Sequence, residues 1–189
     1  QRDRNTDLIY ISYSTPKTQS RTYLYNLKTK EKKLVKEQII PSGHDPKNYV
    51  VERVECNSDD GRKVPLTITR HKDTPLDGSA NLLLYGYGSY GASMSPSFSS
   101  TRLSLINRNI IWVTAHIRGG MERGMKWWKE GKLLNKKNTF NDYIAAANFL
   151  INKKFTSKGK IIGMGGSAGG LLMGAVVNKA PDLFLGMIM

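Results

Sequence analysis

The stretch Lys160–Gly174, KIIGMGGSAGGLLMG, decides the fold of this chain and also holds its most informative motifs. An apolar run leads into a glycine-rich turn, and a segment rich in Ala, Leu, Met and Val follows. This pattern predicts a buried strand at Lys160–Met164 and a helix at Ser167–Lys179. Two motifs overlap in the turn: Gly163–Ala168 matches the dinucleotide fingerprint G-x-G-x-x-A, and Gly165–Gly169 matches the nucleophile elbow G-x-S-x-G.

The dinucleotide interpretation requires an acidic residue about 20 positions beyond the glycines, to bind the ribose. That window, Leu183–Met189, contains neither Asp nor Glu, and Asp182 precedes the expected strand. The elbow interpretation requires small residues around a serine in a strained turn, and four supply them: Gly165, Gly166, Ala168 and Gly169. The sequence therefore favours a serine nucleophile, Ser167, with the backbone N–H of Ala168 as the first oxyanion donor.

Further apolar runs flank this stretch and predict more buried strands at Asn81–Tyr85, Asn109–Ala115 and Phe184–Met189. Apolar periodicity predicts a helix over 140–152, and Thr139-Phe140-Asn141-Asp142 resembles a capping box at its start. Apolar strands that alternate with helices are typical of a parallel α/β sheet. The active site of such a sheet lies at the carboxyl ends of its strands.

The glycine-rich loop Gly86–Gly91 follows one of these carboxyl ends. Tyr87 in this loop offers a phenol that can supplement or replace a backbone N–H as the second oxyanion donor. Tyr85 lies on the preceding strand, so we expect it to pack there. The sequence thus places two candidate oxyanion donors at the same edge of the sheet as Ser167.

The first part of the chain has a different pattern. Short aromatic and β-branched segments at 8–13 and 21–27, with a further one near 33–35, are typical of antiparallel strands. The polar, proline-containing segment Pro41–Pro46 predicts a linker. Beyond it, the Asp-Gly pair in Ser58–Arg62 predicts a hairpin that joins two strands, Tyr49–Cys56 and Lys63–Arg70.

Composition excludes several classes of site. The 189 residues carry a formal net charge of +14 and one cysteine, Cys56, so no disulfide forms within the chain and no cysteine zinc cluster exists. The lysines are scattered and are not interleaved with stacking aromatics, so we interpret the charge as a solvated surface and expect no nucleic-acid partner. No apolar run is long enough to span a bilayer, so we expect no membrane partner. The single cysteine makes a cytoplasmic location the default expectation.

Four motifs, YGYGSYG, AHIRGG, GKLLNKKNTFNDYIAAANFL and GGSAGGLLMGAVVNKAPDLF, together resemble the prolyl oligopeptidase family of serine peptidases, and within it oligopeptidase B (protease II). The resemblance implies an α/β fold in which a partial α/β-hydrolase domain follows the last strands of a β-propeller. Residues 1–42 are expected to be the end of the last blade and a linker. Residues 43–189 are expected to be the N-terminal part of the peptidase domain, truncated before the triad Asp and His.

The same resemblance implies site residues and a reaction. It makes Ser167 the nucleophile, Tyr87 and the amide of Ala168 the oxyanion donors, and Tyr90 a residue near the substrate pocket. The implied enzyme is a serine endopeptidase that hydrolyses short peptides after Lys or Arg through an acyl-enzyme, with no cofactor and no metal. The positions of Ser95 and Ser97 can be acidic in oligopeptidase B, which weakens the case for a dibasic preference.

The loop at 118–122 departs from the family pattern, since Met121 stands where the commoner sequence RGGGE has glycine. We expect Arg118 and Glu122 to have a structural role, as an ion pair. His116 precedes this loop at the end of an expected strand, and we expect it to pack or to anchor the loop.

No histidine follows Ser167, and the sole carboxylate after it is Asp182. The triad order in α/β-hydrolases is serine, then acid, then histidine, and a serine without a base is a weak nucleophile. We therefore expect the chain alone to be inactive. Because Met189 falls within the last expected strand and apolar edges are left exposed, we also expect the chain to aggregate or to need a partner that carries the missing C-terminal part of the same domain. Two alternatives stay open: a non-catalytic remnant of a split or decayed peptidase gene, and an α/β-hydrolase esterase.

Overall fold

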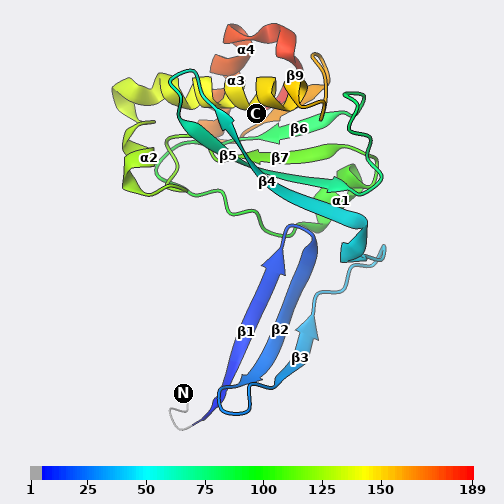
Figure 1. Cartoon of the computed structure of the whole chain (residues 1–189). Helices are drawn as coiled ribbons and strands as arrows, with labels where there is room; N and C mark the ends of the chain where they lie inside the picture. The colour runs from blue at the N-terminus through cyan, green and yellow to red at the C-terminus, as the bar shows by residue number, and fades with distance from the viewer. Residues whose placement is uncertain (1–5) are drawn as a thin grey trace.

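The computed structural model describes residues 6–189, which form two β-sheets (Figure 1). The first is a three-stranded antiparallel sheet of β1 (Leu8–Thr15), β2 (Thr18–Asn26) and β3 (Lys32–Glu37), which confirms the three predicted strands. Most of its apolar side chains are exposed, Tyr10 to 72%, so the described part of this sheet has little core of its own. Residues 1–5 of the expected unit 1–42 lie outside the described residues.

The second sheet is mixed and has six strands in the order β4-β5-β7-β6-β8-β9. β4 and β5 form the predicted antiparallel hairpin, and β5 pairs antiparallel with β7. The other pairs are parallel, so the parallel sheet expected from the apolar runs is confirmed for four strands and the hairpin extends it. The strands are β4 (Tyr49–Asn57), β5 (Lys63–His71), β6 (Leu82–Tyr85), β7 (Ile111–Ala115), β8 (Ile161–Met164) and β9 (Phe184–Ile188).

Helices cover both faces of the mixed sheet (Figure 1). α3 (Lys136–Asn152) and α4 (Ala168–Lys179) lie over one face, while α1 (Ser100–Ile106) lies against the other. The short helices α1 and α2 (Met125–Lys129) were not predicted, because neither is long enough to show a clear apolar period. Single 3₁₀ turns occur at Pro46–Asn48, Leu133–Asn135 and Pro181–Leu183.

The central strands are apolar on both faces, as expected for a sheet covered on both sides. Leu82 and Leu84 of β6 face the larger core beneath α3 and α4, whereas Leu83 faces the smaller core beside α1. The outer strand β9 is less protected, since Leu185 is 62% exposed. An exposed apolar edge strand favours self-association, which agrees with the expectation that the chain aggregates.

α3 differs from the helix that periodicity predicts. It begins at Lys136, and Thr139 and Asp142 lie inside it with buried side chains, so the predicted capping box is wrong. The Thr139 hydroxyl donates to the carbonyl of Arg118 at 2.8 Å and also lies 3.1 Å from the carbonyl of Gly131. Both carbonyls lie outside α3. They satisfy the buried Thr139 hydroxyl, which therefore does not cap the start of the helix.

Asp142 binds Arg118, and both side chains are at most 2% exposed. One carboxylate oxygen accepts from Arg118 Nε at 2.8 Å and from its backbone N–H at 3.0 Å, and the other lies 2.6 Å from a terminal guanidinium nitrogen. Asp60, in the β4–β5 turn, binds the guanidinium from the other side at 2.5 Å. Burial lowers the pKa of Arg118, but the two carboxylates outweigh this effect and raise it overall.

The expected Arg118–Glu122 ion pair is therefore wrong. Glu122 instead accepts a hydrogen bond from the backbone N–H of Met94 at 2.8 Å, and its carboxylate lies 3.7 Å from His116 Nδ1. His116 Nε2 lies 3.2 Å from a nitrogen of Arg53, which can only donate, so in the neutral ring the proton sits on Nδ1 and faces Glu122. The buried His116 packs and anchors the loop after β7, as predicted.

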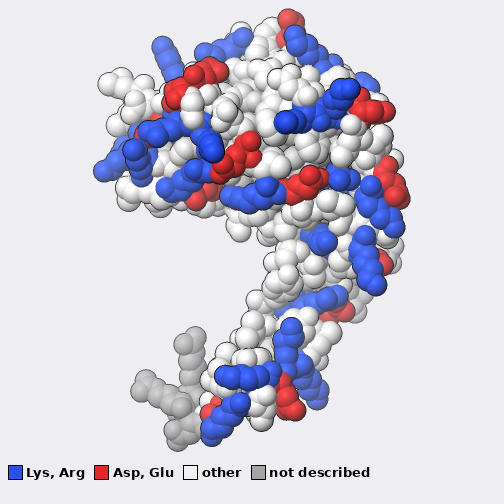
Figure 2. Space-filling view, in the orientation of Figure 1, with Lys and Arg blue, Asp and Glu red and all other residues white. Residues whose placement is uncertain are grey.

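On the face that Figure 2 shows, lysine and arginine side chains are spread out with acidic side chains among them. This distribution agrees with a solvated charged surface, and the absence of a nucleic-acid partner stays a prediction. No helix among the described residues is long and apolar enough to cross a membrane.

Replacing Asp142 with Asn should destabilise the chain by about 3–5 kcal/mol, because the buried guanidinium of Arg118 then loses its principal carboxylate. Urea unfolding followed by circular dichroism measures the loss. The matched control is Glu55→Gln, which breaks the Glu55–Arg123 pair, whose side chains are 43% and 39% exposed. That control should cost less than about 1 kcal/mol. Equal losses in the two variants would contradict a special role for the buried pair.

Candidate functional site

Three loops meet at the carboxyl ends of the parallel strands. They follow β6 (residues 86–91), β7 (116–120) and β8 (165–167). The N–H of Gly86 donates to the carbonyl of Met164 at 3.0 Å, and the N–H of Gly91 donates to the carbonyl of Gly119 at 2.9 Å. This is the edge at which the sequence predicts an active site.

Ser167 stands between β8 and α4 and is exposed to solvent. Its backbone has φ 56° and ψ −120°, a conformation that costs a non-glycine residue roughly 1–3 kcal/mol. The turn is tight: a Cβ on Gly165 would lie 2.7 Å from the carbonyl oxygen of Gly169 and 2.8 Å from that of Gly86. A strained serine between a strand and a helix, with no room for a side chain at Gly165, is the geometry of a nucleophile elbow.

Ala168 is the first residue of α4, which has 12 residues. The N–H groups in the first turn of a helix have no intrahelical partner, and the helix dipole favours negative charge there. The Ala168 N–H is therefore available beside Ser167, where an oxyanion would develop.

Tyr87 lies against the elbow. A Cβ on Gly169 would lie 3.6 Å from Tyr87 Cδ2 and 3.0 Å from the carbonyl oxygen of Gly86, so the loop after β6 packs directly on the first turn of α4. Tyr87 is half-buried, and no hydrogen bond to its hydroxyl occurs among residues 6–189. The structure thus brings Tyr87, Ser167 and Ala168 to one place.

Tyr90, at the far end of the same loop, is 83% exposed and has a positive φ of 56°. It lines a pocket of about 480 Å³ that begins at the first turn of α4. The other residues of this pocket come from α4, the start of α3, α2 with the segment that follows it, and the loops after β6 and β7: Ala168, Leu171, Lys136, Trp128, Gly131, Lys132, Leu133, Ser89 and Gly119. Tyr90 and Ala168 therefore line one cavity, and the role of Tyr90 near a substrate stays a prediction.

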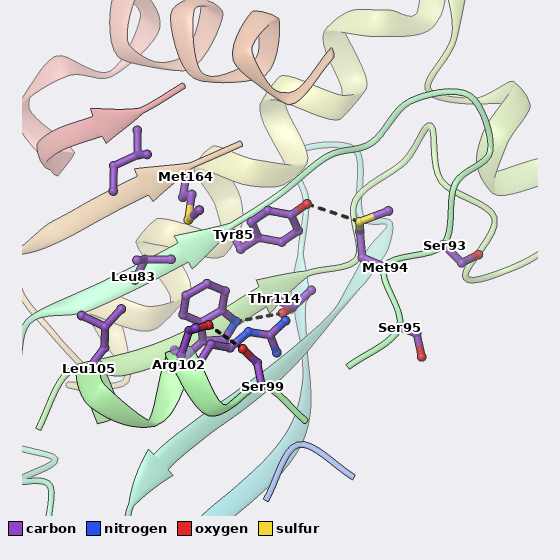
Figure 3. A pocket seen from close by; sticks show the side chains of 13 residues that line it. Leu83, Tyr85, Ser93, Met94, Ser95, Ser99, Arg102, Leu105, Thr114 and Met164 are labelled. Carbon is purple, nitrogen blue, oxygen red and sulfur yellow. Dashed lines mark hydrogen bonds between the residues drawn. The ribbon is translucent and has the colours of Figure 1, made fainter. Parts of the chain in front are cut away.

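A second cavity, of about 550 Å³, lies on the α1 side of the sheet (Figure 3). Tyr85 lines it, and its hydroxyl lies 3.6 Å from the sulfur of Met94, so Tyr85 packs on its strand as predicted. Ser95 also lines it, and Arg102 lies over the Trp112 ring at 4.7 Å. Neither Ser167 nor Ala168 contributes to this cavity, so the candidate site is the smaller pocket beside the elbow.

No hydrogen bond joins a histidine to the Ser167 side chain within the described part of the chain. His116 is directed at Thr67, whose hydroxyl lies 2.8 Å from Nε2. His44 binds the carbonyl of Lys17 at 2.8 Å, and His71 packs edge-on against Tyr49. Residues 6–189 therefore bring together a candidate nucleophile and two candidate oxyanion donors, and none of the three histidines is hydrogen-bonded to Ser167.

Sequence reasoning missed the part that α3 plays in this site. Lys136 contacts the loop that carries Tyr87, and Thr139 and Asp142 hold the loop after β7. In the sequence, Lys136 looks like half of an exposed Lys-Lys pair. Its position at a helix start, where the dipole disfavours a cation, gave no signal, because the apolar periodicity places the start of the helix at residue 140 and the structure places it at Lys136.

Ser167→Gly should be more stable than Ser167→Ala by about 1 kcal/mol, because glycine adopts the positive φ without strain. Thermal and urea unfolding of the two variants measure the difference. Ser104→Gly and Ser104→Ala, inside α1, are the control. There the glycine variant should be the less stable one by about 0.5–1 kcal/mol, because glycine inside a helix is unfavourable relative to alanine. The same order at both positions would argue against strain at Ser167.

Comparison with known proteins connects this geometry to a family. The model of the prolyl oligopeptidase family matches residues 96–189. Dipeptidyl aminopeptidase BI from Pseudoxanthomonas mexicana is 46% identical over 183 residues, which cover 96% of this chain and 25% of that protein. Protease 2 from Moraxella lacunata is 44% identical over 183 residues, which cover 96% of this chain and 26% of that protein.

Among solved structures, oligopeptidase B from Leishmania major superposes with a TM-score of 0.88 at 41% identity, over 98% of this chain and 26% of that one. The chain thus spans about a quarter of the length of the relatives that it matches. The likeness to oligopeptidase B is confirmed, and so is the expected fold class, part of an α/β-hydrolase domain preceded by strands of a β-propeller. The chain belongs to the prolyl oligopeptidase family.

Proposed function

We propose that this chain carries the nucleophile and the oxyanion donors of a serine endopeptidase that hydrolyses short peptides. The observation that carries the proposal is the strained elbow at Ser167 beside the free N–H of Ala168 and the Tyr87 loop. The hydroxyl oxygen of Ser167 attacks the peptide carbonyl carbon, and the two donors bind the oxygen that becomes negative. A base takes the serine proton and gives it to the leaving amine, and water then hydrolyses the acyl-enzyme.

The base and the acid that orients it have to come from outside these 189 residues. The three histidines of the chain are engaged elsewhere, and Asp182 lies in the 3₁₀ turn after α4, where it is exposed. We therefore propose that the chain alone is inactive and that the rest of the same domain is its partner. In keeping with this, we assign residues 1–42 to the end of a propeller blade with its linker, and residues 43–189 to the peptidase domain.

Cleavage after Lys or Arg is the finer part of the proposal and rests on the likeness to oligopeptidase B. The pocket beside the elbow contains Lys132 and Lys136 and no acidic residue among its described lining. A cationic side chain needs carboxylates, so these too would have to be supplied from outside the chain. An Arg-linked and a Pro-linked chromogenic peptide, assayed side by side, distinguish cleavage after Arg from cleavage after Pro.

A fluorophosphonate probe tests the nucleophile. In a family-length polypeptide that contains this chain, the probe should label the wild type at Ser167 and leave Ser167→Ala unlabelled, while the isolated chain should react far more slowly because it lacks a base. Tandem mass spectrometry locates the adduct. Equal labelling of wild type and Ser167→Ala, or hydrolysis of peptides by the isolated chain, would refute the proposal.

In a family-length polypeptide that contains this chain, Tyr87→Phe should lower kcat for peptide hydrolysis by about 10²–10³-fold. The substitution removes one oxyanion donor without changing the shape of the loop. Tyr85→Phe is the matched control, since its hydroxyl contacts a methionine sulfur on the other face of the sheet, and it should change kcat little. Similar losses in both variants would mean that Tyr87 is not an oxyanion donor.

A further inference from the structure

The first residue of α3 is a lysine in an unfavourable place. Lys136 stands at the positive end of the helix dipole, where a cation is disfavoured. Its side chain is half-buried, and burial lowers its pKa. No carboxylate among residues 6–189 forms an ion pair with it. The adjacent Lys137 is exposed, so a solvated alternative for a positive charge exists one residue away.

The ammonium group of Lys136 binds the loop after β6. Its Nζ donates to the carbonyl oxygen of Gly88 at 2.5 Å and to the hydroxyl of Ser89 at 2.8 Å. These two residues directly follow Tyr87. A charged donor forms stronger hydrogen bonds than a neutral one, and partial burial strengthens them further. Lys136 therefore ties the loop at the point where it leaves Tyr87.

The loop is also in close contact with its surroundings at this point. Gly88 has φ 64°, and a Cβ there would lie 2.4 Å from the methyl group of Thr139 and 2.9 Å from the carbonyl of Arg118. The contacts of Gly88 limit its position, and the bond from Lys136 fixes the direction of its carbonyl. Rotating this peptide unit would move Tyr87, the residue before it, relative to the first turn of α4.

We propose that Lys136 is a positioning residue, which holds the Gly88–Ser89 backbone so that the Tyr87 hydroxyl faces the oxyanion beside Ala168. The inference rests on the proposed function, in which Tyr87 is an oxyanion donor. It accounts for a half-buried cation at a helix N-terminus that has no acidic partner among residues 6–189. It also assigns a role to Lys136, whose charge does not stabilise α3 at this position.

A double-mutant cycle with Tyr87 tests the proposal in a family-length polypeptide that contains this chain. Lys136→Met should lower kcat about 10- to 100-fold, which is less than the loss of a whole oxyanion donor costs. It should leave KM within about threefold of the wild-type value, because a positioning effect acts in the transition state. Lys136→Arg, which keeps the charge, should recover part of kcat. In the Tyr87→Phe background, Lys136→Met should cause little further loss. Lys137→Met is the matched control and should match the wild type.

Three results would overturn the inference. Losses from Lys136→Met and Tyr87→Phe that multiply would show that Lys136 does not act through Tyr87. A raised KM with unchanged kcat would assign Lys136 to the pocket instead. If circular dichroism shows that neither Lys136→Met nor Lys136→Gln folds, the role of Lys136 is structural.

Failure of the proposed function is distinguishable from these results, because peptide hydrolysis would then persist in Ser167→Ala. In that case the variants at Lys136 would change the rate of peptide hydrolysis in the Ser167→Ala background as well.

Discussion

The candidate site depends on the buried ion pair between Arg118 and Asp142. Taking two charges out of water costs free energy that their attraction only partly offsets, so such a pair is poor evidence of added stability. What it provides here is one fixed arrangement: Arg118 uses its backbone N–H as well as its guanidinium to bind Asp142. The loop after β7 is thereby locked to α3, and the N–H of Gly91 binds that loop at the carbonyl of Gly119. The position of the Tyr87 loop thus depends on an ion pair in which Ser167 takes no part.

α3 is best understood as the support for the ends of the strands. Lys136, Thr139 and Asp142 follow one another at intervals of three, so they lie on one side of the helix. Tyr143 extends this side, and its hydroxyl donates to the carbonyl of Leu84 in β6 at 2.5 Å. Each of these four polar groups has its partner in a strand end or in the loop that follows it. Buried polar groups that are fully satisfied specify a single arrangement, and here that arrangement brings the Tyr87 loop against the elbow.

The sequence predicted the strands and the elbow well, because their signals are local. Apolar runs located β6, β7, β8 and β9, and small residues around Ser167 identified a turn that the structure confirms as strained. The buried polar side of α3 could not be predicted from periodicity, since Thr139 and Asp142 are accepted in a core only because Arg118 lies opposite them. The predicted partner of Glu122 was wrong for the same reason, because its actual partner, the N–H of Met94, is 28 residues away in the sequence. Polar contacts between residues far apart in the sequence produce no periodic pattern.

The most direct test of this account is a crystal structure of a family-length polypeptide that contains this chain, with Ser167 phosphonylated by a fluorophosphonate. The phosphonyl oxygen stands for the oxyanion of the acylation step. If Tyr87 and Ala168 bind the oxyanion, this oxygen lies about 2.7–3.1 Å from both the Ala168 nitrogen and the Tyr87 hydroxyl, with Lys136 still bound to the carbonyl of Gly88. An adduct whose oxygen points away from Tyr87, or a Tyr87 loop released from α3, would contradict these roles.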